Sequence, residues 1–269
     1  MGKEIDLLLL LKKLHDDRPA RASSSVLISK LASLADTITI SDSSVSASTA
    51  LYPARWNGTD ARWNEFQWWD NKILSAPLYG LPAAAFTSPD AFQHVCSVVG
   101  ATAGASGWTF DGTDDQITVP DANILDVSSG LTILLAMKKT TTADSIPIRK
   151  SNAFNVQINN NSDIYFYLGG AGGWWVPDPV VRITINTDCH LALSYNGTNK
   201  AIYINGAVQQ TSAQTGNLTA TTTDFLIGGI AGYYYAGVLG DIMLYNRGLS
   251  ATEISAAYTD AKTRMPWLP

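Results

Sequence analysis

Acidic residues gather in one stretch of the chain and could hold a metal ion. Asp111, Asp114 and Asp115 stand within five residues of one another, and Asp121 and Asp126 follow shortly after. Carboxylate oxygens are the ligands that Ca²⁺ prefers, so calcium is a candidate cofactor at this stretch. The spacing is not that of a dedicated calcium loop, and short carboxylates beside glycine also form turns by accepting bonds from their own backbone. Both interpretations stay open.

Two clusters of aromatic residues follow glycine-rich runs and could bind a ligand. They are Trp174 and Trp175, after residues 169–173, and Tyr233, Tyr234 and Tyr235, after residues 228–232. Amphipathic rings exposed on loops can stack on the face of a sugar while making one hydrogen bond. Alternatively, one residue of each cluster points into the core and another packs against a neighbouring subunit. The clusters therefore predict either carbohydrate contact, or protein contact and core packing.

The sequence contains few of the groupings that catalyse reactions. His15, His94 and His190 lie on three separate segments, and no HExxH spacing provides a pair of zinc ligands. A G-x-S-x-G elbow and a phosphate-binding G-x-x-x-x-G-K-[ST] loop are also missing. We interpret His190, at the start of a predicted strand, as a half-buried histidine with satisfied nitrogens. These observations disfavour an enzyme.

The composition of the chain disfavours some kinds of binding partner. The 269 residues have a net charge of −5, and 15% are charged, compared with about 25% in an average soluble domain. Without a basic field, we expect no nucleic-acid binding. No run of about 18 apolar residues predicts a membrane-spanning helix. Cys96 and Cys189 have no CxxC spacing, so we predict two buried thiols, with a single disulfide bridge as the alternative.

The first residues differ from the rest in charge and hydropathy. A strong helix-forming segment contains a run of consecutive leucines, and these cover every side of a helix, so the helix needs partners on several sides. The candidate assembly residues are Ile5, Leu7, Leu8, Leu9, Leu10, Leu11 and Leu14. Because lysines flank the leucines closely, we interpret the segment as mature protein and not as a secretion signal.

We predict three parts along the chain. Residues 1–50 form an anchoring or oligomerisation arm with helical segments and a serine-rich end. Residues 51–78 are rich in aromatic residues without a clear period, which favours a collar packed against the next domain over a ligand surface. Residues 79–269 form the main domain.

Short strands dominate the third part. We predict strands over residues 131–137, 163–168, 190–195, 200–204, 223–228 and 237–245. The Asn196-Gly197 and Asn205-Gly206 pairs predict two hairpin turns. One helix is predicted after Ser250, because Ser250 and Glu253 have the spacing of a capping box. The pattern indicates an all-β, two-sheet antiparallel jelly-roll sandwich.

Several motifs, in order, resemble the laminin G-like jelly rolls of the concanavalin A-like lectin/glucanase superfamily. Residues 108–117 (WTFDGTDDQI) resemble an opening strand of this family, and residues 129–133 (SGLTI) resemble the next one. Residues 190–197 (HLALSYNG), 202–206 (IYING), 226–229 (LIGG) and 237–250 (GVLGDIMLYNRGLS) resemble the later strands and the closing turn. The resemblance covers residues 79–262 and is strong for fold and weak for function.

The resemblance also bears on chemistry. Some members of the superfamily are glycosidases with an E-x-D-x-E strand, but Glu4, Glu65 and Glu253 lie on no candidate concave strand. We therefore predict that the protein is not an enzyme. The family often carries Asp-Glu before its last strand, whereas here Ile242 follows Asp241. Asp241 is thus added to Asp111, Asp114 and Asp115 only as a structural or calcium-facing carboxylate.

Our first hypothesis for the function is a structural protein of a bacteriophage virion, such as a head decoration protein, head fibre or tail-associated protein. Residues 1–40 would hold it to copies of itself or to other virion proteins, and the jelly roll would face outward, with a glycan as its candidate ligand. The alternative is a free-standing extracellular carbohydrate-binding protein, or less favourably a carbohydrate-active enzyme. The expected location is the virion surface, or the extracellular space under the alternative.

Overall fold

The computed structural model describes residues 72–80 and 82–269. The predicted arm over residues 1–50, most of the predicted collar over residues 51–78, and the candidate assembly residues Ile5, Leu7 to Leu11 and Leu14 lie outside the described residues. Among the described residues, no helix is long and apolar enough to cross a membrane.

The described residues form two antiparallel sheets. Neighbours in the first sheet follow the order β14 (Ala207–Ala213), β13 (Asn199–Ile204), β12 (Cys189–Tyr195), β7 (Leu131–Lys139), β16 (Ala236–Tyr245), β5 (Gly107–Asp111) and β4 (Thr102–Gly104). The long strand β16 pairs with β5 through its first residues and with β1 (Lys72–Pro77) through its last ones. The first sheet therefore includes a strand from within the 51–78 segment.

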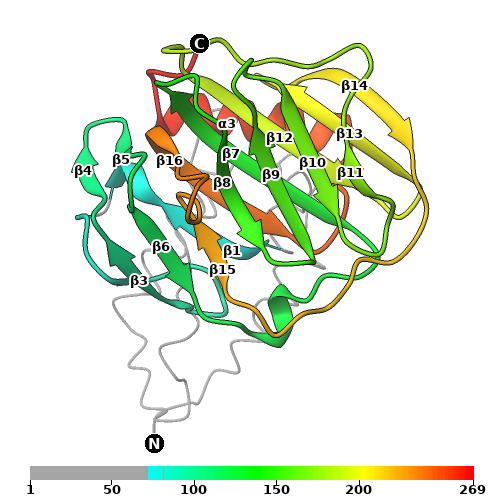
Figure 1. The fold of residues 1–269 in the computed structure, drawn as a ribbon, viewed down its shortest axis with the longest axis horizontal. Helices are drawn as coiled ribbons and strands as arrows, with labels where there is room; N and C mark the ends of the chain where they lie inside the picture. Colours follow the sequence, from blue (N-terminus) through cyan, green and yellow to red (C-terminus); the bar gives the residue numbers. More distant parts are fainter. Residues whose placement is uncertain (1–71, 81) are drawn as a thin grey trace, which may run out of the picture. The chain divides into compact units, whose positions relative to one another are not determined.

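The second sheet lies against the first. Its order is β11 (Gly173–Trp175), β10 (Ile164–Leu168), β9 (Phe154–Ile158), β8 (Ser145–Lys150), β15 (Phe225–Ile227), β6 (Gln116–Val119), β3 (Val95–Val99) and β2 (Phe86–Thr87). Figure 1 views the molecule with this sheet toward the reader. The predicted two-sheet sandwich is confirmed by this arrangement.

Side chains from the facing sides of both sheets fill one continuous core. In β7, Leu131, Ile133, Leu135 and Met137 alternate into this core. The residues between them face the other side of the sheet, where Leu134 and Ala136 are also buried. Because both faces of β7 are covered, its sequence is an almost uninterrupted apolar run.

A single α-helix among the described residues covers the outer face of the first sheet. It is α3 (Ala251–Arg264), and it packs Ile254 and Ala257 against Leu134, Tyr203 and Met243. The predicted capping box is confirmed, because the Ser250 hydroxyl accepts from the Glu253 N–H and the Glu253 carboxylate accepts from the Ser250 N–H. Two short 3₁₀ helices, η2 (Leu78–Gly80) and η3 (Asn123–Leu125), complete the described structure.

The two predicted hairpin turns and the two predicted buried thiols are also confirmed. Strands β12, β13 and β14 are consecutive neighbours joined at the two Asn-Gly pairs. Asn205 and Gly206 both have positive φ, at 52° and 75°, as a type I′ turn requires. Cys96 and Cys189 are buried and unbridged.

Candidate functional site

The two outer faces of the sandwich differ. Helix α3 covers the face of the first sheet, whereas the face of the second sheet carries partly exposed aromatic and polar side chains. Residues directly opposite one another on paired strands point to the same side. By strand register, one row on this face runs across the sheet through Trp174, Tyr167, Asn155, Arg149, Leu226, Thr118 and Ser97.

Two aromatic rings at one end of this row form a surface that we call the aromatic ledge, made of Trp174 and Tyr167. Their ring centroids lie 5.2 Å apart, with the planes inclined by 59°. The Trp174 side chain is 47% exposed, an unusual fraction for a tryptophan in a folded domain. Trp174 was predicted on a glycine-rich loop, but it lies in the edge strand β11, because its backbone continues the sheet beyond β10.

Trp175 faces the opposite way from Trp174. Successive residues of a strand point to opposite sides, so Trp175 enters the core and is only 7% exposed. The Lys200 ammonium lies 5.1 Å from its ring centroid, in a cation–π contact. Trp175 is thus a core residue, as the core-packing interpretation of this cluster expects.

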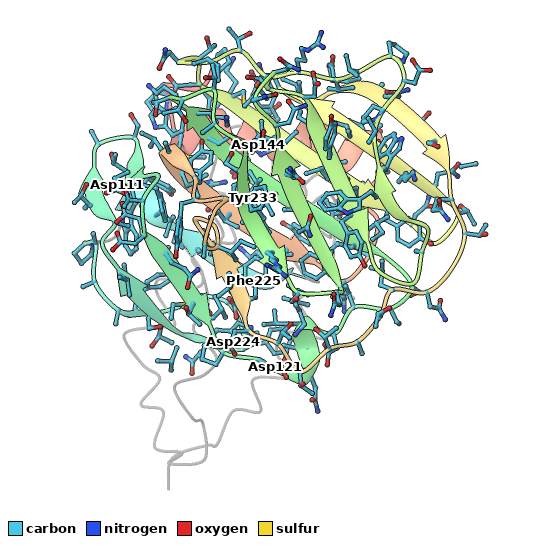
Figure 2. The ribbon with its side chains drawn as sticks, viewed as in Figure 1. Asp111, Asp121, Asp144, Asp224, Phe225 and Tyr233 are labelled. Atoms are coloured by element: carbon cyan, nitrogen blue, oxygen red, sulfur yellow. The ribbon has the colours of Figure 1, made fainter. Side chains whose placement is uncertain are left out.

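The three tyrosines divide in the same manner. Tyr235 is fully buried against Phe110, with ring centroids 6.4 Å apart, and burial raises the pKa of its hydroxyl well above the usual value. Tyr233 is 39% exposed, and Tyr234 is partly exposed. The Tyr233 carbonyl accepts a 2.9 Å bond from the Ile146 N–H, which holds the tyrosine loop along β8 (Figure 2). Tyr233 and Tyr234 therefore remain at the surface, near the second sheet.

Asn155, like Tyr167 and Arg149, is a residue of this face that the sequence did not single out. It is 8% exposed, and its Oδ1 atom is buried without a hydrogen-bond partner. It lies directly opposite Tyr167 on one neighbouring strand and Arg149 on the other. A buried acceptor without a partner destabilises a protein by about 1–3 kcal/mol, so such groups call for an explanation. The alternation of buried Phe154, Val156 and Ile158 would have placed Asn155 on the outer side.

Three of the four candidate calcium ligands come together. One oxygen each of Asp111, Asp114 and Asp115 lie within 4.8 Å of one another. Two carboxylate oxygens already accept turn bonds: Asp115 from the Asp111 N–H at 2.8 Å and Asp111 from the Thr113 N–H at 2.7 Å. Burial raises the pKa of Asp115, and the nearby charges of Asp111 and Asp114 also raise it. The remaining oxygens are chemically suited to a hard cation.

A glycine makes room for the buried member of this group. A Cβ atom on Gly100 would lie 1.8 Å from Asp115 Oδ1, and Gly100 has a φ of +74°. Any side chain at position 100 would therefore displace the Asp115 carboxylate.

The other aspartates have different partners. Asp241 does not join the cluster: it is buried and pairs with the Arg264 guanidinium of α3. Of the two predicted roles, structural or calcium-facing, the structural one fits this pairing, because Asp241 in β16 points at α3 and its charge is neutralised there. Asp121 and Asp126 both pair with the ammonium of Lys150, whose side chain is fully buried.

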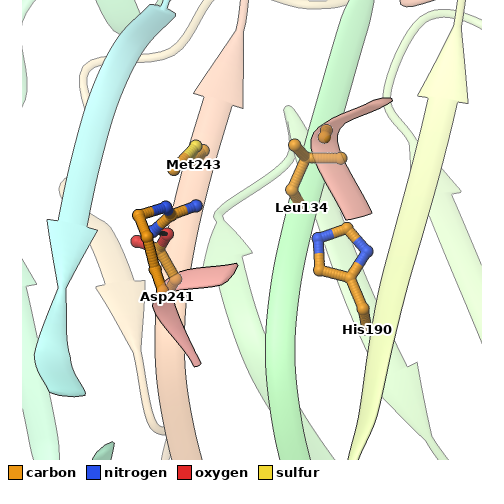
Figure 3. A pocket seen from close by; sticks show the side chains of 6 residues that line it. Leu134, His190, Asp241 and Met243 are labelled. Carbon is orange, nitrogen blue, oxygen red and sulfur yellow. Dashed lines mark hydrogen bonds and ion pairs between the residues drawn. The ribbon is translucent and has the colours of Figure 1, made fainter. Parts of the chain in front are cut away.

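His190 and Asp241 line a small cavity under α3. Its other lining residues are Leu134, Met243, Ala257 and Arg264 (Figure 3). The space of about 10 Å³ is close to what one water molecule needs and excludes a substrate. The expectation that His190 is half-buried and satisfied was wrong, because it is fully buried and its Nδ1 has no partner. Burial, with a smaller effect of the Arg264 charge, lowers the pKa of His190 to about 4.

The sequence of the sandwich matches a family model. The model, of laminin G type and described as the concanavalin A-like lectin/glucanases superfamily, matches residues 111–255. The chain belongs to this superfamily. A comparison with curated protein sequences finds no match. Superfamily membership fits the sandwich described above, and the superfamily name itself covers both sugar-binding and sugar-cleaving proteins.

Solved structures with a similar fold include several binding domains. The receptor binding domain of botulinum neurotoxin C/D mosaic serotype has a TM-score of 0.54 at 15% identity, covering 71% of this chain and 52% of that one. The binding domain of Paraclostridial Mosquitocidal Protein 1 has 0.57 at 12% identity, with 72% and 53% covered. The binding domain of botulinum neurotoxin serotype G has 0.56 at 16% identity, with 72% and 52% covered. This superfamily member spans about half the length of those chains, and the likeness shows the fold.

Sugar-cleaving members of the superfamily use glutamates, and of the three glutamates in this chain the structure describes one. Glu253 sits in the capping box of α3 and pairs with Arg247 at 2.8 Å. Burial alone would raise the pKa of Glu253, but hydrogen bonds from Arg247 and Ser250 together outweigh it, so the pKa is lowered. Glu253 thus serves the helix end and lies away from the aromatic ledge. Glu4 and Glu65 lie outside the described residues.

Proposed function

We propose that this domain binds carbohydrate on the outer face of its second sheet. The observation that carries the proposal is the pairing of an exposed aromatic ledge with the unpartnered Asn155 oxygen one strand away. An aromatic face packs on the C–H groups of a sugar ring, and the Asn155 amide oxygen can accept a hydrogen bond from a sugar hydroxyl. The similar structures include a receptor binding domain of a botulinum neurotoxin and the binding domain of a mosquitocidal protein, which is consistent with this proposal.

The test of carbohydrate binding uses the full chain and a glycan array, followed by calorimetry on the strongest hit. Trp174→Ala is expected to weaken binding about tenfold or more, because the stacked ring is lost while the fold is kept. Phe92→Ala is the matched control: Phe92 is similarly exposed, at 45%, but precedes β3 near the opposite edge of the sheet. The control is expected to bind like the unchanged protein. An array without hits, or equal losses in both variants, would refute the proposal.

We further propose that the domain binds sugar without cleaving it. The cavity that gathers histidine and carboxylate chemistry is too small for a sugar. The described face with the aromatic ledge offers an amide and a guanidinium in place of paired carboxylates. Incubation with the glycan that binds best is expected to release no new reducing ends. Release that disappears in a carboxylate variant would contradict the proposal.

For the whole chain we propose a structural role in a bacteriophage virion, as a head decoration, fibre or tail-associated protein that displays this domain. The support is the leucine run in residues 7–11, which would cover every side of a helix and would suit burial among copies of the chain. Comparing the solution mass of the full chain with that of a chain lacking residues 1–40 tests it. We expect an oligomer that the deletion dissociates. Monomers in both cases, with no affinity for virion proteins, would favour the free-standing extracellular alternative.

We also propose a calcium ion at Asp111, Asp114 and Asp115, supported by the proximity of their oxygens. A ligand that binds only the folded state stabilises it, so millimolar calcium is expected to raise the thermal midpoint. Asp114→Asn should remove this rise, whereas Asp144→Asn, which changes an exposed aspartate elsewhere, should keep it. An unchanged midpoint over the whole titration would exclude the ion.

A further inference from the structure

We infer that the sugar recognised by this face carries a carboxylate, which Arg149 binds. The inference rests on the proposed carbohydrate binding and adds the chemical class of the ligand. Arg149 occupies the outer face of β8, directly opposite Asn155, and its side chain is partly exposed. The row thus places an aromatic ledge, an unpartnered acceptor and a guanidinium on consecutive strands.

Among residues 72–80 and 82–269, no carboxylate pairs with Arg149. Several other described basic residues pair with carboxylates: Lys138 with Asp188, Lys150 with Asp121 and Asp126, Arg182 with Asp163, Arg247 with Glu253, and Arg264 with Asp241 and Asp260. Arg149 instead donates a 3.0 Å bond to the Ser151 hydroxyl, and its other cross-strand neighbour is Leu226. In a chain with a net charge of −5, a guanidinium without an acidic partner on the candidate ligand face points to an anionic ligand.

The order of the row matches the order of groups on such a sugar. Adjacent strands lie about 4.8 Å apart, so Tyr167, Asn155 and Arg149 span about 10 Å, close to the length of a disaccharide. The apolar face of one ring packs on Tyr167 and Trp174. A hydroxyl or amide N–H of the ligand donates to Asn155 Oδ1, and the carboxylate reaches Arg149.

An arginine suits this role better than a lysine would. Its planar guanidinium donates two parallel bonds to a carboxylate, which fixes the orientation of the sugar as well as its charge. The contact is partly exposed, so its contribution falls as salt screens the charges. Discrimination between charged and neutral sugars should therefore decrease with ionic strength, whereas stacking on the aromatic ledge should not.

The experiment measures affinities of the full chain for three probes by calorimetry. These are sialyllactose, an oligogalacturonate, and lactose as the neutral sugar. The two acidic probes separate the two sources of a sugar carboxylate, a sialylated glycan end and a uronate polymer. We expect at least one of them to bind about tenfold or more tightly than lactose, because hydrogen bonds to a charged group are among the stronger ones.

Two charge variants complete the test. Arg149→Gln should remove the preference for the acidic sugar, so that the acidic probe binds no more tightly than lactose. Lys262→Gln, on the exposed side of α3 at the other face of the sandwich, removes the same charge and should keep the preference. Two outcomes overturn this inference alone, provided that lactose binding depends on Trp174. Either neither acidic probe binds more tightly than lactose, or Arg149→Gln leaves the preference for the acidic probe intact. Binding of no sugar at all overturns the proposed function as well.

Discussion

His190 is a buried base that the folded protein keeps neutral. Its Nδ1 atom has no hydrogen-bond partner, and Asp241 and Arg264 line the same small cavity. Burial and the Arg264 charge lower its pKa to about 4, from an ordinary value of about 6.5. Between about pH 6.5 and about pH 4, His190 is protonated in the unfolded chain but not in the folded one, so the folded state loses stability as the pH falls.

We therefore predict that the free energy of unfolding falls by on the order of 3 kcal/mol as the pH falls from about 6.5 to about 4. Urea denaturation across this range measures it. In His190→Gln the fall should be smaller. Asp241 has the opposite effect on stability at low pH, because burial raises its pKa more than Arg264 lowers it. Asp241 is present in both proteins, so it does not alter the comparison. Equal slopes in the two proteins would show that His190 is protonated in the folded state.

At the residue scale, the sequence identifies candidate residues but not the directions in which their side chains point. Trp174 and Trp175 are adjacent and chemically identical, yet one is exposed and the other lies in the core. The difference follows from strand pairing with β10, which the glycine-rich run before them conceals. Asn155 has no motif at all, and its significance depends on neighbours from two other strands. The structural partner of Asp241 could not be found from local sequence, because Arg264 comes from a helix later in the chain.

Helix α3 is an element whose start is set by one side chain. Ser250 accepts a 3.3 Å bond from the Glu253 N–H, and the helix buries Ile254 and Ala257 on the first sheet. We predict that Ser250→Ala lowers the free energy of unfolding by about 1 kcal/mol, because the cap is lost. Ser255→Ala, an exposed position inside the same helix, should be neutral or slightly stabilising. Urea denaturation compares the two, and equal effects would mean that the cap contributes nothing.

Elements were predictable where the local sequence is strong. Strands β7, β12, β13 and β16 coincide with predicted strands, because long apolar or alternating runs and Asn-Gly turns bound them. Strand β1 and the short strand β4 were not predicted. Lys72–Pro77 contains a proline and is a strand because β16 extends beyond β5 and offers a free edge there. Thr102–Gly104 is wholly exposed and has no pattern that marks a strand.

At the scale of the domain, the two sheets serve different purposes because different elements cover their outer faces. The central strands β7, β12 and β16 of the first sheet are buried on both faces, one in the sandwich and one under α3, so their residues serve stability. The second sheet buries one face and leaves the aromatic ledge and Arg149 on the other. Family membership predicts the sandwich but not this asymmetry of surface chemistry. The chemistry of the ligand therefore depends on the side chains of the uncovered face, which family membership does not specify.

The two cysteines report on whether the sandwich unfolds as a unit. Cys96 lies in β3 of the second sheet and Cys189 in β12 of the first, and both belong to the same core cluster. Burial raises the pKa of each thiol to about 12, so neither forms the reactive thiolate in the folded protein. Both should therefore react with a thiol reagent only through opening of the core.

We predict that both thiols are labelled slowly in the native protein, with the same dependence on urea as global unfolding. Strands β3 and β12 share one core, so exposing either thiol requires the two sheets to separate. Mass spectrometry of peptides after timed labelling follows each cysteine separately, and Cys96→Ala and Cys189→Ala verify the assignment. Faster labelling of Cys96 at low urea would show that the edge formed by β2 and β3 opens by itself, and that the sandwich has two units of stability instead of one.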